Sequence, residues 1–170
     1  MAVTTQYGTE YTSALVTKPA VLLPTSTWHG RLRSAFVSHT QSGAGDATSS
    51  VALLALPAGT VRLIQPLCYL YVNWTTASAT LDLGWDAYTG LDGVAVAADP
   101  NGITDGLDVE TADVYGFEEL SASIGTGITA ATGYTKVFSS KEGVVLRATS
   151  QDQALAGSDS LSGVIVYQYD

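Results

Sequence analysis

The segment Thr80–Tyr88, TLDLGWDAY, alternates between apolar and polar side chains along its length. The side chains that share the apolar side are Leu81, Leu83, Trp85 and Ala87. The opposite side carries the carboxylates of Asp82 and Asp86. Because the side chains of an extended chain alternate with a period of two, this pattern is typical of a half-buried β-strand. The segment therefore predicts a strand with one face in a core and one acidic face in water, leading into a loop-rich region.

Further β-like segments recur along the chain between turn signals; 30–40 alternates imperfectly, 50–56 is apolar on both faces and fits a covered strand, and none has a convincing helical period. Besides 80–88, the expected strands are 30–40, 50–56, 60–65, 67–74, 134–139, 143–149 and 161–169. Pro66 interrupts one long stretch, which predicts an edge position or a bulge because proline lacks the backbone donor. About eight strands with almost no helix predict an all-β domain over residues 29–170: an antiparallel β-sandwich, with jelly roll as the preferred topology. The side chains expected in its core are Phe36, Leu83, Trp85, Leu146 and Ile165.

Residues 1–28 are rich in Ser, Thr and Ala, and Pro19 and Pro24 rule out a long helix there. We expect an extended N-terminal arm that is too apolar to stay exposed and that binds a partner. The arm residues expected to make this contact are Tyr7, Tyr11, Leu15, Val16, Leu22, Leu23 and Trp28. The alternative is that the arm packs as an extra edge strand on its own sandwich or on a sister subunit.

Residues 89–109 contain several glycines and little periodicity, which predicts long loops, and residues 109–123 have room for one helical turn. An EF-hand-length window has oxygen ligands at the expected positions 1, 3, 7 and 12, namely Asp99, Asn101, Asp105 and Glu110, but Ile103 replaces an expected ligand and Thr104 the expected glycine. The EF-hand motif therefore fails. Two interpretations stay open, a calcium site of another kind and a loop of Asx turns without metal. The candidate calcium ligands are Asp99, Asn101, Asp105 and Asp108.

The formal net charge is −9, and no basic residue occurs between Arg62 and Lys136. Phosphate binding needs clustered Lys and Arg, so the sequence argues against nucleic acid as the main partner. The acidic stretch fits a solvated face, and alternatively a site for a cation or for a basic partner. The N-terminal sequence predicts neither a signal peptide nor a membrane span. Cys68 has no second cysteine to pair with, which favours a reducing compartment or a fold indifferent to redox, and a role for Cys68 as a small core side chain.

The sequence contains no set of residues with catalytic spacing. Asp82 and Asp86 would lie about 13 Å apart on one strand, which is too far for a glycosidase pair. His29 and His39 have no nucleophile-elbow serine, and one cysteine with two histidines gives no zinc spacing. We therefore expect no enzyme activity and no cofactor. The aromatic residues near the acidic stretch are expected in the core, with a sugar-binding platform as the alternative: Trp85, Tyr88, Tyr115 and Phe117.

The segment 80–88 is followed by Asp92-Gly93, by DPNG at 99–102 and by DGLDV at 105–109. In the order of these motifs, and over residues 60–170, the chain resembles the small head proteins of tailed bacteriophages. The resemblance implies a jelly-roll decoration (cement) protein, often a homotrimer, that binds the major capsid protein outside the head shell and resists internal pressure. It also implies assembly in a host cytoplasm, away from membranes. The rival reading is a phage fibre domain or a carbohydrate- or receptor-binding module.

Overall fold

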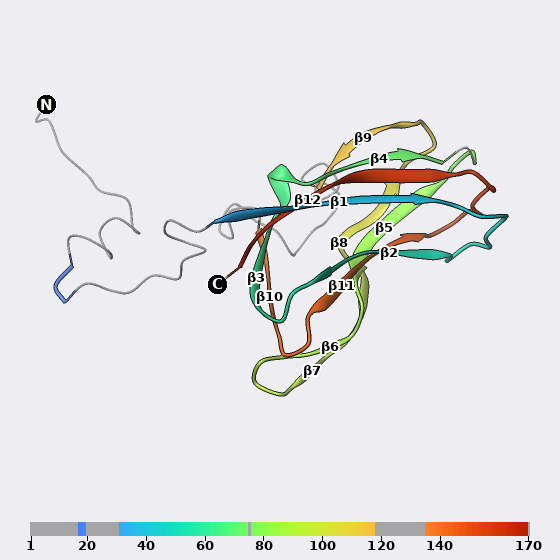
Figure 1. Ribbon diagram of the computed structural model, residues 1–170. Coiled ribbons are helices and arrows are strands. Elements are labelled where there is room, and N and C mark those ends of the chain that lie inside the picture. Colours follow the sequence, from blue (N-terminus) through green and yellow to red (C-terminus); the bar gives the residue numbers. More distant parts are fainter. Residues whose placement is uncertain (1–16, 20–30, 75, 118–134, 170) are drawn as a thin grey trace, which may run out of the picture.

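The computed structural model describes residues 17–19, 31–74, 76–117 and 135–169. Apart from Phe117, which is helical, the regular structure of these residues consists of strands and one 3-10 turn, η2 at Gln65–Leu67, which confirms the all-β class (Figure 1). The strands are β1 (Leu32–Thr40), β2 (Ser50–Leu56), β3 (Gly59–Ile64), β4 (Tyr69–Asn73), β5 (Thr80–Trp85), β6 (Tyr88–Thr89), β7 (Ala95–Val96), β8 (Asp99–Asp108), β9 (Asp113–Gly116), β10 (Thr135–Ser140), β11 (Val144–Ser150) and β12 (Ser160–Tyr169). Among the described residues, no helix has the length and apolar character needed to cross a membrane.

β3 and β4 behave as one long strand that η2 interrupts. Leu63 pairs with Tyr167 of β12, and Tyr69 pairs with Val164 of the same strand. The chain advances six positions from Leu63 to Tyr69 while β12 moves back by three, so η2 is a bulge of three residues. Pro66 lies in this turn, outside the hydrogen-bonded ladder. The bulge is therefore confirmed, and the edge position is wrong because β12 and β10 flank β3.

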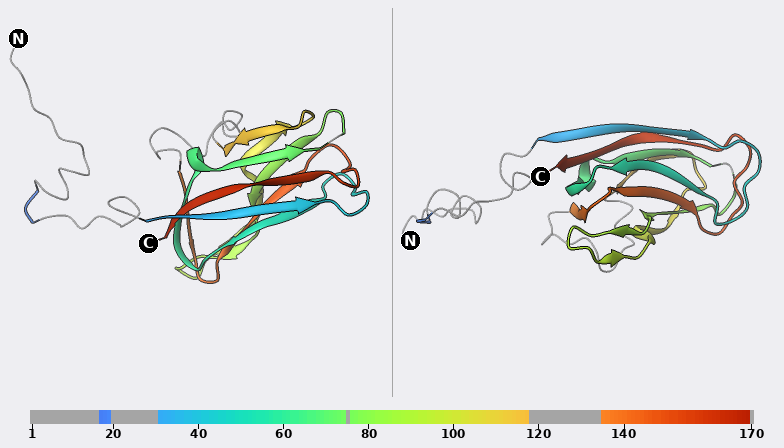
Figure 2. Two further views of the ribbon diagram at one scale, coloured as in Figure 1. Left: turned by 45° about the horizontal axis from the view of Figure 1, so that its top comes forward. Right: turned by 60° about the horizontal axis from the view of Figure 1, so that its bottom comes forward.

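The strands pair from the two ends of the sequence inward. β1 pairs with β12, β2 with β11, β3 and β4 with β10 and β9, and β5 with β8, always antiparallel. One sheet has the order β10-β3-β12-β4-β9 with β1 on the other side of β12, and the second has the order β2-β11-β5-β8. Nested pairing wrapped into two facing sheets is the jelly roll, so the expected topology is confirmed (Figure 2).

The core lies between the two sheets and is built from apolar side chains that alternate along the strands. Four of the five expected core residues are buried, namely Leu83, Trp85, Leu146 and Ile165. The rings of Trp85 and Phe138 pack edge to face, with 5.4 Å between their centroids. Phe36 is 85% exposed, so its expected burial is wrong. β1 carries apolar residues on both sides, and its neighbour Val37 turns inward instead.

β5 is buried on both faces, which corrects the expected half-buried strand. Asp82 is only 7% exposed. Gly84 lies so close to β8 that an added Cβ atom would stand 1.9 Å from the carbonyl oxygen of Asp99. The register between β5 and β8 is irregular at two places, and the backbone of Asp99 and Pro100 crosses over Gly84. Protein rather than water therefore covers much of the acidic face.

Residues 89–109 are not a long loop, because most of them belong to β7 and β8. β8 is the edge strand of its sheet, where proline and an irregular register are tolerated despite the turn-forming sequence. Residues 113–116 form β9 and Phe117 follows in helical conformation, whereas residues 118–123 of the segment expected to hold a helical turn lie outside the described residues. The expected boundary between arm and sandwich, at residue 28, lies outside the described residues.

Candidate protein interface

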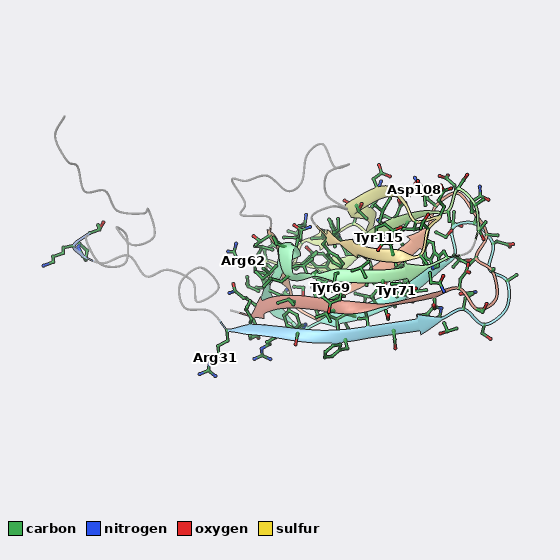
Figure 3. All side chains as sticks on the ribbon, turned by 90° about the horizontal axis from the view of Figure 1, so that it is seen from above. Arg31, Arg62, Tyr69, Tyr71, Asp108 and Tyr115 are labelled. Atoms are coloured by element: carbon green, nitrogen blue, oxygen red, sulfur yellow. The ribbon has the colours of Figure 1, made fainter. Side chains whose placement is uncertain are left out.

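The outer face of β1, β12, β4 and β9 carries exposed aromatic side chains in register. The residues that form two adjacent rows on it are Phe36, Val164 and Tyr69, then Ser38, Ser162, Tyr71 and Val114. They point away from the core because their sequence neighbours Val37, Leu70 and Val72 are buried. Figure 3 looks onto this face, with Tyr69 and Tyr71 near its middle. We call this surface the aromatic face.

A groove of about 410 Å³ lies on the aromatic face. The central strand β12 contributes the small residues Ser162 and Gly163 to its lining, and larger rings stand on the strands to either side. Phe36 is 85% exposed, Tyr69 45% and Tyr71 40%. Contiguous apolar surface of this kind marks interaction sites, and tyrosine is enriched in protein interfaces because it combines a large ring with a polar tip. The aromatic face is therefore the best candidate for a binding surface.

Acidic side chains gather where β8 of the second sheet leads to β9, and Asp113, in register with buried Val72, lies on the core side of its sheet. Asp108, Glu110 and Asp113, which we call the acidic tip, are exposed at the end of β8 and the start of β9. The Ser78 amide donates to Glu110 Oε2 at 3.1 Å, and the Glu110 amide donates to Asp108 Oδ1 at 3.1 Å. Burial, and then the charges of these three carboxylates, raise the pKa of Tyr115, whose hydroxyl donates to the Thr111 carbonyl at 2.7 Å. Figure 3 shows Asp108 and Tyr115 on this side of the sheet.

The opposite end of this sheet is basic. Arg62 lies on its outer side, whereas Arg33, in register with Tyr167 and buried Leu63, lies on its core side. Arg31 precedes β1, Arg33 lies on β1, and Arg62 lies on β3; we call these three residues the basic end. Arg33 stands over the ring of Tyr169 at 5.5 Å, and Arg62 Nη1 donates to Thr135 Oγ1 at 3.1 Å. β1, β3, β10 and β12 contain no acidic residue. Arg31 and Arg62 are both visible at this end in Figure 3.

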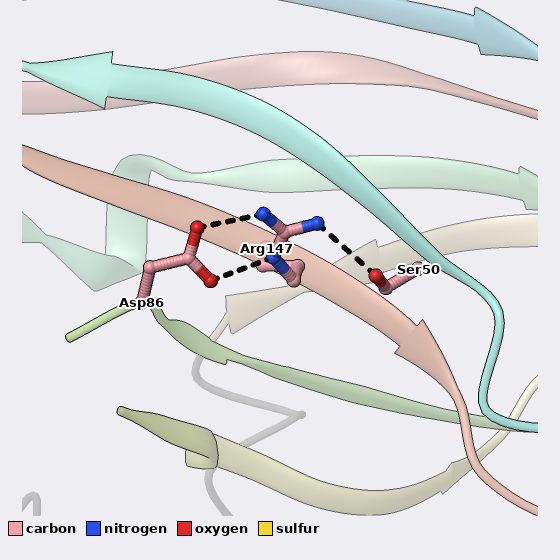
Figure 4. A network of polar contacts seen from close by, with 3 residues as sticks. All are labelled: Ser50, Asp86 and Arg147. Atoms are coloured by element: carbon pink, nitrogen blue, oxygen red, sulfur yellow. Dashed lines mark hydrogen bonds and ion pairs between the residues drawn. The ribbon is translucent and has the colours of Figure 1, made fainter. Parts of the chain in front are cut away.

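The outer face of the second sheet carries an ion pair (Figure 4). Arg147 donates from Nε and Nη2 to the two oxygens of Asp86 at 2.7 and 2.6 Å, and from Nη1 to Ser50 Oγ at 3.1 Å. This bidentate hydrogen bonding lowers the pKa of the Asp86 carboxyl and raises that of Arg147. A groove of about 380 Å³ lies beside the pair, lined among others by Asp82, Pro100 and Gln151.

Asp82 behaves differently from Asp86, four residues along the chain. Burial raises the pKa of Asp82, the Gly106 amide that donates to its Oδ1 at 2.8 Å lowers it, and the charges of Asp105 and Asp152 raise it further. The two carboxylates thus have pKa shifts of opposite sign.

The four candidate calcium ligands all lie on β8 but do not converge. Asp99 pairs with Trp85 and Asp108 pairs with Thr80, so these two carboxylates stand at opposite ends of β5. Those partners are five positions apart along β5, which corresponds to roughly 17 Å, whereas calcium ligands lie about 2.5 Å from the ion. Asp105 instead accepts a hydrogen bond from Gln151 Nε2 at 3.5 Å. In the described part of the chain, no group of acidic, His or Cys side chains has a geometry that could hold a metal ion.

The other expected site residues fall into two groups. The arm residues Tyr7, Tyr11, Leu15, Val16, Leu22, Leu23 and Trp28 lie outside the described residues. Of the four aromatic residues weighed as a sugar platform, Trp85 and Phe117 are buried, and Tyr88 and Tyr115 are half-buried and packed against the core. A platform of exposed rings is therefore absent from these four positions.

Cys68 is a buried core residue. Its Sγ donates to the carbonyl of Ile64 at 3.2 Å and accepts from the Val166 amide at 3.2 Å. Burial raises the pKa of the thiol to about 11. The interpretation of Cys68 as a small core side chain is confirmed.

The aromatic face was not predicted from the sequence. The signal was present in β4, where Tyr69 and Tyr71 alternate with Leu70 and Val72 and so give the strand two apolar sides. A strand of a two-layer sandwich has only one side in the core, so the second side had to be exposed or covered by a partner. For Phe36, the choice between the two sides of β1 depended on Val37, which no spacing rule identifies.

No family model matches the chain, and no curated protein matches its sequence. Among solved structures, it is similar to a chain of the cyanophage Pam1 capsid asymmetric unit, at 13% identity and a TM-score of 0.43 over 88% of this chain and 93% of that one. It is also similar to a chain of the Helicobacter pylori bacteriophage KHP30 capsid, at 16% identity and a TM-score of 0.38 over 81% and 93%.

A chain of infectious bursal disease virus, Gt strain, is similar at 11% identity and a TM-score of 0.42, over 82% of this chain and 32% of the viral one. This chain thus spans about a third of that viral protein. The similar structures named here are viral capsids or particles. Their identities and TM-scores are too low to assign the chain to a family.

Proposed function

We propose that this chain is a structural protein of a bacteriophage virion that binds the outside of the head shell and stabilises it, as a decoration or cement protein does. The aromatic face carries the proposal: Phe36, Tyr69 and Tyr71 lie exposed on an otherwise well-packed jelly roll. A protein that works alone in water gains nothing from such a surface, whereas an assembly protein buries it in its contacts. The resemblance of residues 60–170 to small phage head proteins supports a phage head as the assembly.

The proposed partner is the major capsid protein of the shell, and the decorating unit is a homotrimer assembled in the host cytoplasm. The N-terminal arm, through Tyr7, Tyr11, Leu15, Val16, Leu22, Leu23 and Trp28, makes the main contact with the coat. An extended segment that orders on contact can cover a wide surface and bridge neighbouring subunits. Neither enzyme activity nor a metal or cofactor is part of the proposal.

A second candidate is a carbohydrate- or receptor-binding module, and one observation favours it. The groove beside Asp86 and Arg147 places charged and polar side chains around a space of about 380 Å³, with Gln151 and Asp82 in its lining. Sugar hydroxyls bind to such charged and amide groups through hydrogen bonds. The groove lacks an exposed aromatic ring on which a sugar could stack, since Trp85, which borders it, is 7% exposed.

Cosedimentation tests the proposal against this rival. The full-length chain is mixed with empty, undecorated head shells, and in parallel with host cells and immobilised glycans. Saturable binding to shells, with a fixed number of chains per coat subunit and no binding to cells or glycans, is the expected result. Arg147→Ala should leave shell binding intact, because it alters only the polar groove. Binding to cells or glycans that Arg147→Ala abolishes, together with no binding to shells, would establish the rival.

A further inference from the structure

Asp82 is a nearly buried carboxylate that lines the groove beside Asp86 and Arg147. The register between β5 and β8 shifts here, so Asp82 stands opposite two residues of β8, Asp105 and Gly106. Gly106 has a φ of +65°, a conformation that glycine adopts readily, and its amide donates to Asp82 Oδ1 at 2.8 Å. This β-bulge therefore holds the carboxylate in the wall of the groove.

The Asp82 carboxylate has no cationic partner within the described part of the chain. Among the described residues that line the groove, Arg147 is the only basic one, and its guanidinium already donates to Asp86 and to a serine hydroxyl. Burial raises the pKa of Asp82, and the charges of Asp105 and Asp152 raise it further. A nearly buried carboxylate without a counter-ion lowers stability, so a ligand that brings a positive charge gains an attraction that the described chain does not supply.

We propose that this groove binds a lysine or arginine side chain of a partner protein, with the cation against Asp82. The groove offers about 380 Å³, and the Thr149 hydroxyl and the Gln151 amide oxygen in its lining are acceptors for further N–H donors of the cation. No basic residue occurs between Arg62 and Lys136, so the acidic stretch attracts cations to this sheet. A neutral sugar is the competing occupant, but it leaves the charge of Asp82 uncompensated. The inference goes beyond the proposed function and does not depend on attachment to a shell.

Small analogues of the two side chains test the groove by NMR titration of the full-length chain. N-acetyl-arginine amide and N-acetyl-lysine amide each carry one positive charge, and N-acetyl-citrulline amide has the shape of the arginine analogue without its charge. The charged analogues should shift the signals of the Gly106 amide and the Gln151 side-chain amide saturably, with dissociation constants of about 1–10 mM. The citrulline analogue should bind about tenfold more weakly or not at all, because it forms no charge-assisted hydrogen bond with Asp82.

Two matched substitutions identify the carboxylate that binds the cation. Asp82→Asn should weaken binding of both charged analogues about tenfold, while its amide oxygen still accepts from the Gly106 amide. The control is Asp113→Asn in the acidic tip, which also removes a carboxylate that accepts from a backbone amide, that of Val114 at 2.7 Å, but lies outside the groove lining. It should leave binding unchanged. Far-UV circular dichroism verifies that both variants fold.

Three results would overturn the cation site. They are the absence of saturable shifts at these two signals up to about 50 mM of either charged analogue, equal binding of the citrulline analogue, and an equal effect of Asp82→Asn and Asp113→Asn. Saturable shifts of the same signals by a neutral disaccharide, without a response to either cation, would instead establish the sugar as the occupant. Cosedimentation with head shells is scored separately, so its failure would refute the proposed function and leave this inference standing.

Discussion

Phe36 of β1 and Tyr69 of β4 lie in one row on the outer face of their sheet, each in register with Val164 of β12 between them. The two aromatic residues are 33 positions apart in the sequence, and the strand that joins them comes from the end of the chain. The row therefore exists only when the jelly roll has formed. Any binding through this face depends on a folded chain and should be lost on unfolding.

Truncation of Phe36 should hardly change stability, whereas truncation of Trp85 should lower it strongly. Phe36→Ser removes an 85% exposed ring and should change the free energy of unfolding by no more than about 0.5 kcal/mol, whereas Trp85→Ala should cost about 3–5 kcal/mol. Urea unfolding measures both values. Comparable destabilisation by the two substitutions would mean that Phe36 is buried in the folded protein, which would contradict the aromatic face.

Much of the fold was predictable, since the alternation in 143–149 and the short apolar run at 50–56, which ends at a turn signal, both locate strands. The strand pattern predicted the wrong structure where the residue types favour one conformation and the position in the fold imposes another. β8 contains Asp, Pro, Asn and Gly, which predict turns. It forms a strand because an edge strand tolerates these residues. The acidic residues of β5 predicted a solvent-exposed face. This prediction was wrong because the backbone of the neighbouring strand crosses over Gly84, which a sequence does not reveal. The aromatic face could not be predicted for a related reason. Both sides of β4 are apolar, and which side is buried depends on tertiary packing.

The two aspartates of the second sheet should respond to pH with opposite sign. The folded pKa of Asp86 is lowered, so its ion pair with Arg147 contributes stability above the unfolded pKa, near 3.9, that is lost as the pH falls through the folded value. The folded pKa of Asp82 is raised, so its charge disfavours folding above that value and the penalty disappears on acidification.

At pH 7, Asp86→Asn should therefore lower the free energy of unfolding, by no more than about 1 kcal/mol because the pair is partly exposed. Asp82→Asn should leave it unchanged or raise it, since the amide oxygen still accepts from the Gly106 amide. Both differences from the wild type should shrink towards pH 3, as measured by thermal unfolding across the pH range. A loss of stability in Asp82→Asn as large as that in Asp86→Asn would show that the Asp82 charge is stabilising.

Cys68 should be unreactive in the native protein. Its pKa of about 11 leaves about one thiol in a thousand ionised at pH 8, and its side chain is 2% exposed. A chromogenic disulfide reagent should find no thiol in the folded chain and one per chain in denaturant. Rapid labelling without denaturant would mean that η2 and the start of β4 open readily.

The N-terminal arm should be needed for attachment and not for folding. A chain that lacks residues 1–28 should keep its β-sheet circular dichroism spectrum and lose most of its binding to undecorated shells. Substitution of Tyr7, Tyr11 and Trp28 by serine in the full-length chain should weaken binding in the same direction, because it removes the apolar contacts and keeps the length. Undiminished attachment of both variants would exclude the arm as the anchor and make the acidic stretch at 89–119 the better candidate.

The heat resistance of empty head shells tests the central claim most directly. Differential scanning calorimetry is performed on shells alone, on shells saturated with the full-length chain, and on shells mixed with the chain that lacks residues 1–28. We predict that the full-length chain raises the temperature at which the shell disassembles, and that the truncated chain does not. A disassembly temperature that stays the same at saturating full-length protein would contradict the assignment of this chain as a shell-stabilising protein.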